Sequence, residues 1–251
     1  MTSAVDPALA RGVLALADDE LILGHRNSEW TGHGPILEED IAFTNLALDE
    51  VGHAQLWYRL AAELLGEDPD SQPDRWVFFR GQEEYRNLRL VELPRGDWAF
   101  SMLRQYLFDA LERVRLQALA NAGEARVHAV SAKIAREEAY HLRHTAAWVR
   151  RLGKGTEESR RRMQAALEAI WPHTSQMFAP VFEDSALDLQ PPAVLQEAWE
   201  GLVRPHLAGS GLMVPAMAES AVAGREVHTP HLGGLLSEMQ QVARTEAEAS
   251  W

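Results

Sequence analysis

Apolar residues recur every three or four positions along most of this chain, and this helical periodicity restricts its fold more than any other feature. The stretch 36–66 shows it most clearly, because seven residues in such steps share one side of the expected helix. They are Phe43, Leu46, Glu50, His53, Trp57, Leu60 and Leu64. The alternation typical of strands is scarce, so the pattern predicts an all-α protein.

Breaks in the periodicity fall at glycine- and proline-containing stretches, which set the expected helix ends. We expect helices over about 7–28, 36–66, 82–90, 97–122, 124–152, 156–178, 193–205 and 229–249. No linker is long enough to separate two domains, so we expect residues 1–251 to form one domain. Its core bundle would span about 7–152, with accessory helices at about 156–249.

Two ionisable residues, Glu50 and His53, stand in the apolar series where an apolar side chain is expected. Burying an isolated carboxylate is costly, so such a residue is either paired or bound to something. The stretch 124–152 repeats the anomaly with Glu138 and His141. Both pairs have the spacing Glu-x-x-His, which places the two side chains on one helix face, one turn apart.

Each of these pairs has a carboxylate at a matching position on the preceding helix. In an antiparallel hairpin, residues equidistant from the turn lie at the same depth, as Glu20 and Glu50 do. Asp109 and Glu138 are related in the same way, so the two hairpins read as a distant internal repeat. Glu112, less than one turn from Asp109, is the alternative at that position.

One carboxylate from each of two helices, with Glu-x-x-His from the other two, is the ligand pattern of di-iron and di-manganese bundles. Carboxylate and imidazole groups suit both metals. The sequence therefore predicts a ferritin-like four-helix bundle with additional C-terminal helices and a dinuclear iron or manganese site. The predicted ligands are Glu20, Glu50, His53, Asp109, Glu138 and His141. A dry network, in which these groups pair with one another or with arginines, is the alternative.

Composition and charge exclude several other classes of protein. With 24 basic and 37 acidic residues the net charge is −13, so we do not expect nucleic-acid binding. The absence of cysteine excludes disulfides, thiolate metal sites and iron–sulfur clusters. No apolar run approaches the roughly 18 residues of a membrane span. The first residues lack the pattern of a secretory signal, so we expect no membrane association and a cytoplasmic location.

Basic residues nevertheless crowd one stretch of the chain. They are Arg136, Arg143, Arg150, Arg151, Lys154, Arg160, Arg161 and Arg162. We interpret this stretch as a solvated helix surface, with a docking face for an acidic partner or an anionic substrate as the alternative. We interpret Asp49, next to Glu50, as a surface acid, with a supporting role at the metal site as the alternative. Most other histidines, including His228, are interpreted as surface or capping residues.

Over nearly its whole length the chain resembles the C subunits of phenylacetyl-CoA 1,2-epoxidases. The resemblance is carried by residues 28–42, 85–87, 90–94, 104–110, 139–144, 151–153, 227–233 and 238–240. It implies a ferritin-like subunit of a bacterial monooxygenase complex for aerobic phenylacetate catabolism. In such a complex a homologous A subunit holds the di-iron site that inserts one oxygen atom from O2 into the ring of phenylacetyl-CoA.

The same resemblance implies the partners of the chain. The C subunit pairs with the A subunit and is usually treated as structural, while a separate reductase subunit supplies electrons from NADPH. The expected partners are therefore the homologous catalytic A subunit, the other epoxidase subunits and phenylacetyl-CoA.

The chain departs from this family at the metal ligands. C subunits commonly carry an apolar residue and a glutamine where this chain has Glu50 and His53, and here all six predicted ligands are present. Two functions therefore stay open. The chain is either a structural subunit that stabilises its catalytic paralogue, or a catalytic oxygenase or oxidase subunit acting on an aromatic CoA thioester.

Overall fold

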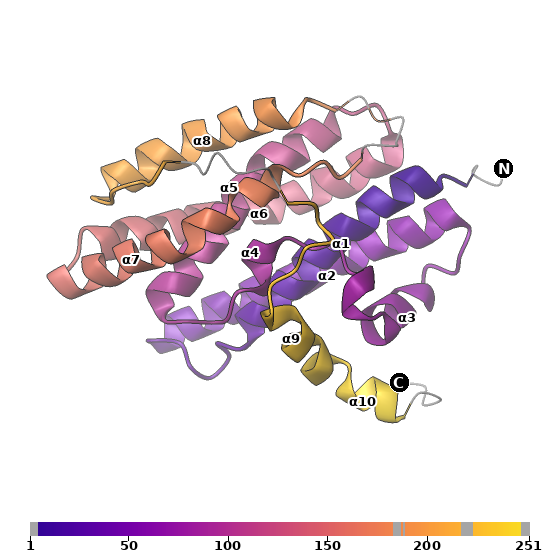
Figure 1. Ribbon diagram of the computed structural model, residues 1–251, viewed down its shortest axis with the longest axis horizontal. Helices are drawn as coiled ribbons and strands as arrows, with labels where there is room; N and C mark the ends of the chain where they lie inside the picture. The colour runs from indigo at the N-terminus through magenta and orange to yellow at the C-terminus, as the bar shows by residue number, and fades with distance from the viewer. Residues whose placement is uncertain (1–4, 183–186, 188, 217–222, 247–251) are drawn as a thin grey trace.

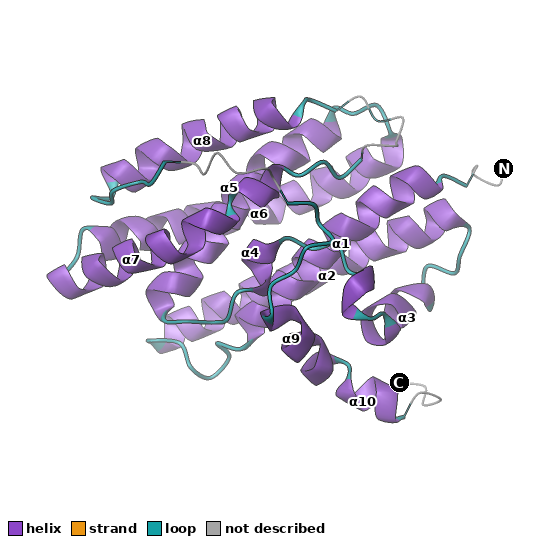
Figure 2. Ribbon diagram, viewed as in Figure 1, coloured by secondary structure: helices purple, strands orange, loops and turns teal. Residues whose placement is uncertain are grey.

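The computed structural model describes residues 5–182, 187, 189–216 and 223–246. Every regular element in these ranges is a helix, as Figures 1 and 2 show. The prediction of an all-α protein is therefore confirmed. None of the helices in the described ranges combines the length and the apolarity that crossing a membrane requires.

Four long helices form the bundle. They are α1 (Pro7–Ser28), α2 (Leu37–Leu65), α5 (Trp98–Ala120) and α6 (Ala125–Gly153). Helix α1 packs along α2 and α5 packs along α6, so the bundle consists of two hairpins, which meet where α2 contacts α6. All seven residues of the predicted apolar series on α2 are at most 3% exposed, so this series faces the interior as expected.

Local sequence signals set the ends of these helices. The carboxylate of Asp6 accepts a hydrogen bond from the backbone N–H of Leu9 at 3.0 Å and caps α1. Asp97 caps α5 in the same way. Gly66, which ends α2, has φ of 72°, a backbone conformation that glycine adopts without strain.

The remaining helices cover the two hairpins on different sides (Figure 1). They are α3 (Gln72–Phe79), η1 (Gln82–Glu84), α4 (Arg89–Glu92), α7 (Glu157–Ile170), η2 (Trp171–His173), η3 (Ser175–Phe178), α8 (Pro192–Gly209), α9 (His231–Met239) and α10 (Gln241–Thr245). Helices α7 and α8 pack on α5 and α6, whereas α3 and α4 pack on the first hairpin. One cluster of buried apolar side chains extends from the bundle into α7, α8 and α9. The single-domain organisation, with its core and accessory parts, stays a prediction.

The helix predicted over 82–90 is wrong. Only the short η1 and α4 form there, and the chain between them is extended. Its backbone N–H groups bind buried side chains of α1 instead of continuing a helix. The N–H of Arg86 donates to Asp18 at 2.9 Å, and that of Leu88 donates to Asp19 at 2.8 Å.

Two other predicted helices are interrupted. The helix predicted over 156–178 gives way to 3₁₀ turns after residue 170, where Pro172 cannot donate a backbone hydrogen bond. The last predicted helix is divided at Gln240, whose side-chain amide donates to the carbonyls of Val77 and Arg80 at 2.8 and 3.1 Å. The end of that prediction, residues 247–249, lies outside the described residues.

The interpretation of His228 as a surface or capping residue is also wrong. Its side chain is 4% exposed, and its Nδ1 lies 2.6 Å from Oε1 of the buried Glu92. Glu92 also accepts a hydrogen bond from the backbone N–H of Thr229. This contact holds the C-terminal segment against α4.

Helix α1 carries three consecutive acids with no exposed surface, Asp18, Asp19 and Glu20. Asp18 accepts hydrogen bonds from the hydroxyl of Tyr58 at 2.6 Å and from the guanidinium of Arg80. Asp19 accepts hydrogen bonds from the guanidinium groups of Arg115 and Arg225. Only Glu20 is left without such a partner, and it faces the centre of the bundle.

We predict that Asp19→Ala strongly destabilises the metal-free protein. Asp19 accepts hydrogen bonds from Arg115 at 2.7 Å and from Arg225 at 3.0 Å, and both cations would stay buried without it. The free energy of unfolding should fall by about 3–5 kcal/mol, measured by urea unfolding. The control is Asp70→Ala, whose exposed pair with Arg59 should contribute about 1 kcal/mol or less. Equal losses in the two variants would contradict this account.

Candidate metal centre

The structure brings the six predicted ligands together in the middle of the bundle. They form two groups, in each of which one ligand atom per residue lies within 4.8 Å of the others. The first group is Glu20, Glu50, His53 and Glu138. The second group is Glu50, Asp109 and His141. All six residues are at most 3% exposed, and Glu50 belongs to both groups.

Both imidazoles point their Nδ1 atoms toward the carboxylates. Nδ1 of His53 lies 3.4 Å from Oε1 of Glu138, and Nδ1 of His141 lies 3.6 Å from Oε1 of Glu50. Nδ1 of His141 lies closer still, at 3.0 Å, to Oε1 of Glu138 in its own motif. Both Nδ1 atoms therefore lie nearest to Glu138, and the two ring centroids are 5.9 Å apart.

A second carboxylate binds the outer nitrogen of each imidazole. Nε2 of His53 lies 2.7 Å from Oε2 of Glu137, and Nε2 of His141 lies 3.1 Å from Oδ2 of Asp49. Such contacts orient the rings, so that with a cation bound Nε2–H would donate outward and the Nδ1 lone pair would face the cation. The supporting role of Asp49, given above as the alternative, is thus the one with a structural contact.

Glu137 was not anticipated, although the sequence contains a signal for it. An acidic residue directly precedes both Glu-x-x-His motifs, Asp49 before Glu50 and Glu137 before Glu138. The side chains of Asp49 and Glu137 are 43% and 47% exposed, as expected for groups at the rim of the site. Their pairing with the histidine of the opposite helix could only be seen in three dimensions.

The geometry favours Asp109 over Glu112 as the carboxylate from α5. Asp109 accepts hydrogen bonds from Gln105 Nε2 and Thr145 Oγ1, both at 2.6 Å, which orient it toward the second group. Glu112 is also buried, but it forms an ion pair with Arg115 and belongs to neither group of described residues.

Gln105 also fixes the shared carboxylate. Its Nε2 donates to Oε1 of Glu50 at 2.6 Å, and its Oε1 accepts from Nδ2 of Asn27 at 2.6 Å. Asn27 in turn accepts a hydrogen bond from the buried guanidinium of Arg104 at 3.1 Å. A chain of buried polar side chains therefore orients the amide of Gln105 toward the acids.

Burial and mutual repulsion favour protonated acids when no cation is bound. Burial, with the neighbouring charges of Glu112 and Glu50, raises the pKa of Glu20 well above its ordinary value. Burial and the charge of Glu138 raise the pKa of Asp109 in the same way. A cation that replaces these protons would relieve the repulsion among the carboxylates.

The histidines also favour their protonated form. Although burial alone would lower it, the nearby carboxylates of Glu138 and Glu50 raise the pKa of His53 to about 10. Glu50 has the complementary change, because the nearby imidazoles of His141 and His53 lower its pKa despite burial. Without metal, the protonated imidazoles supply the positive charge of the centre.

The residues present fit a pair of divalent cations. Several buried lone-pair atoms of the cluster have no hydrogen-bond partner among the described residues. They are Oε1 and Oε2 of Glu20, Oε2 of Glu50, Nδ1 of His53 and Oε2 of Glu138. A polar network that satisfied itself would not leave these atoms unpaired. Oxygen and imidazole nitrogen donors are those that iron and manganese accept.

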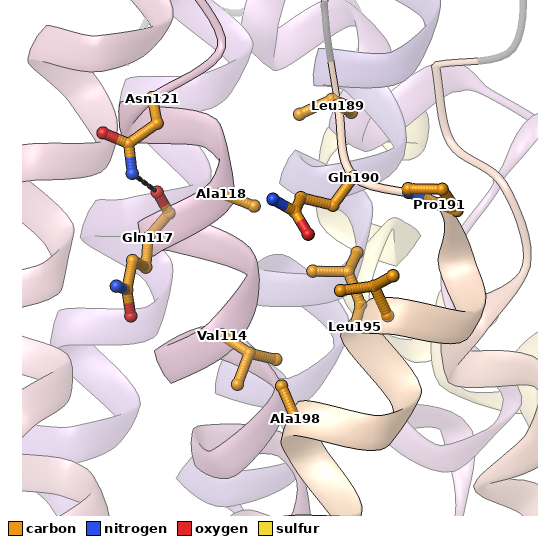
Figure 3. Close-up of a pocket in the computed structure, with 10 residues that line it drawn as sticks. Val114, Gln117, Ala118, Asn121, Leu189, Gln190, Pro191, Leu195 and Ala198 are labelled. Carbon is orange, nitrogen blue, oxygen red and sulfur yellow. Dashed lines mark hydrogen bonds between the residues drawn. The ribbon is translucent and has the colours of Figure 1, made fainter.

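A separate hollow on the second hairpin has no charged or metal-ligating side chains among its described lining residues. It has a volume of about 600 Å³ and lies between α5 and α8 (Figure 3). Its described lining residues are apolar or uncharged, and its polar groups are the side chains of Gln117, Asn121 and Gln190. The amide of Asn121 donates to the carbonyl of Gln117 at 2.8 Å, as Figure 3 shows. The candidate site is therefore the carboxylate and histidine cluster.

The fold and the cluster define the class of the protein, a ferritin-like helical bundle with a carboxylate and histidine centre. A solved structure with a similar fold is protein 19 with aldehyde deformylating oxidase activity from Synechococcus. It matches with a TM-score of 0.55 over 82% of this chain and 90% of that chain, at 17% identity. At this identity the likeness shows a shared fold alone, and it confirms the predicted fold class.

Sequence comparison then gives the family. Residues 1–251 match the family described as phenylacetic acid catabolic protein. The chain is 37% identical over 243 residues to the C subunit of the 1,2-phenylacetyl-CoA epoxidase of Escherichia coli (strain K12), covering 95% of this chain and 97% of that protein. The chain therefore belongs to the phenylacetic acid catabolic protein family, and the resemblance stated from its motifs is confirmed.

We predict that Glu20→Met stabilises the metal-free protein. Both carboxylate oxygens of Glu20 are buried without a hydrogen-bond partner among the described residues, and methionine removes them at similar length. The free energy of unfolding should rise by about 1–3 kcal/mol in urea unfolding of the protein treated with chelator. Glu63→Met, on the exposed side of α2, is the control and should change it by about 0.5 kcal/mol or less. A destabilised Glu20→Met protein would mean that Glu20 has a stabilising partner without metal.

Proposed function

We propose that this chain is the C-type subunit of a phenylacetyl-CoA epoxidase, and that it pairs with and stabilises a homologous catalytic A subunit. The observation that carries this proposal is the 37% identity to the C subunit of such an enzyme, which extends over 95% of the chain. The family match over residues 1–251 places it in phenylacetic acid catabolism. The chain has no cysteine to hold an iron–sulfur cluster, so electrons would come from a separate reductase subunit.

We further propose that the chain has its own dinuclear centre of iron or manganese. The unpaired lone-pair atoms of the cluster support this, because they are donors with no other described partner. The ligands would be Glu20, Glu50, His53, Asp109, Glu138 and His141. Glu50 belongs to both groups of these residues. When bound and reduced, such a centre supplies the chemistry of dioxygen activation.

The surrounding residues would hold this centre ready. Asp49 and Glu137 keep the two imidazoles oriented with Nδ1 inward, and Gln105 and Thr145 position the α5 carboxylate. Partners of this kind commonly raise metal affinity 10- to 100-fold. The burial of all six ligands excludes bulk water from the cluster. A cytoplasmic location is part of the same proposal.

A catalytic role for the chain itself is the second candidate. The observation that favours it is the complete set of predicted ligands. A purely structural bundle has no need of buried carboxylate and imidazole atoms without hydrogen-bond partners. In this case the chain would be an oxygenase or oxidase subunit that acts on an aromatic CoA thioester.

Metal analysis distinguishes a cluster that binds metal from a buried polar cluster that binds none. The chain purified alone should contain about two iron or manganese ions. The double substitution Glu50→Leu, His53→Gln should remove this metal and the stability it confers, because a ligand bound only by the folded state stabilises that state. If the cluster binds no metal, the purified chain should contain none. The double substitution should then leave the free energy of unfolding unchanged or raise it.

Co-expression with the catalytic paralogue tests the pairing. We expect the two chains to elute together in size-exclusion chromatography, and to do so equally with the Glu50→Leu, His53→Gln variant, whose changes lie inside the bundle. Elution of this chain alone in both cases would contradict the proposed subunit role. Turnover of phenylacetyl-CoA by the assembled complex, compared between the wild-type chain and the double variant, then tells whether the metal of this chain takes part.

A further inference from the structure

A cavity of about 160 Å³ lies between α5 and α6, beside the metal centre. Much of its wall is alanine, supplied by Ala120, Ala132, Ala135 and Ala139. The proposed ligand Glu138 is also part of the wall. The cavity is distinct from the hollow in Figure 3, which lies between α5 and α8.

The lining of this cavity extends from the surface to the cluster. Arg113 and Gln117 are exposed, whereas Ser131 and Glu138 are buried. The hydroxyl of Ser131 has no exposed surface and no hydrogen-bond partner among the described residues, and Oε2 of Glu138 also lacks one. The cavity therefore has room for a small guest molecule beside these two groups.

Size and polarity select the guest. A cavity of about 150 Å³ with an apolar wall binds xenon or benzene, and this volume together with the alanine part of the wall suits a guest of a few heavy atoms. A coenzyme A thioester is far too large. A hydrated divalent cation would lose its water against the alanine wall and would meet the positive charge of Arg113 at the rim. A small neutral molecule meets neither obstacle.

We propose that this cavity between α5 and α6 binds a neutral molecule of the size of dioxygen and is the path by which it reaches the metal centre. This proposal rests on the proposed metal centre, because a path for dioxygen has a function only if it leads to a metal that reacts with it. Cations would enter elsewhere, for example beside the half-exposed carboxylates of Asp49 and Glu137, which contact the two ligand histidines.

Xenon tests the binding site without any metal. Crystals of the metal-free protein under xenon pressure should show a xenon atom against Ala135 and Glu138. Ala135→Leu adds three carbon atoms to the wall and should abolish this xenon site. Ala147→Leu is the matched control, since Ala147 is an exposed residue of the same helix outside the cavity lining. A wild-type protein without xenon in this cavity would overturn the proposal.

The rate of oxidation tests the path. Protein loaded anaerobically with iron(II) is mixed with oxygenated buffer, and the ferric absorbance is followed. Ala135→Leu should slow oxidation at least tenfold while the bound iron, measured in the same sample, stays unchanged. Ala132→Leu, on the same wall, should act alike if Ala135→Leu folds poorly, and Ala147→Leu should match the wild type.

The two proposals fail in different ways. Xenon binding with an unchanged oxidation rate in both cavity variants would overturn the path and leave the metal centre standing. A chain that takes up no iron would overturn the metal centre, and with it the path. A loss of iron from the cavity variants would show that the cavity serves metal binding instead.

Discussion

The need to balance buried carboxylates governs this structure. Asp18, Asp19 and Glu20 follow one another on α1 and none has exposed surface, yet they are balanced in different ways. The first two bind arginines from distant parts of the chain, Arg80, Arg115 and Arg225. These pairs tie the end of α3, helix α5 and the C-terminal region to α1. Glu20 has no arginine and faces the other acids of the cluster.

The candidate metal centre also links the two hairpins. Asp49 and His53 of α2 bind His141 and Glu137 of α6, and the two contacts are related by the approximate twofold relation of the repeat. Farther along the same line, the carboxylate of Glu39 accepts a hydrogen bond from the indole of Trp148 at 2.7 Å. Helices α2 and α6 thus meet through polar contacts that also orient the proposed ligands.

The sequence predicted what depends on periodicity and missed what depends on distant partners. The series through Glu50 and His53 predicted α2 and its buried face. The second Glu-x-x-His and the matching positions on the preceding helices predicted the four ligand candidates of the other helices. The extended segment 85–88 could not be predicted, because its backbone donors bind Asp18 and Asp19, more than 60 residues away. The role of Glu137 could have been predicted, since an acidic residue directly precedes both Glu-x-x-His motifs.

The same carboxylate chemistry bears on whether the centre is used. A subunit that only supported its paralogue would be more stable with apolar or amide side chains in place of Glu20, Glu50 and His53, because each buried unpaired polar atom costs about 1–3 kcal/mol. Total stabilities of about 5–15 kcal/mol leave little room for several such atoms. A bound cation offsets this cost, since it contacts the unpaired atoms directly. Metal binding therefore explains the unpaired carboxylate and imidazole atoms of the cluster better than packing does.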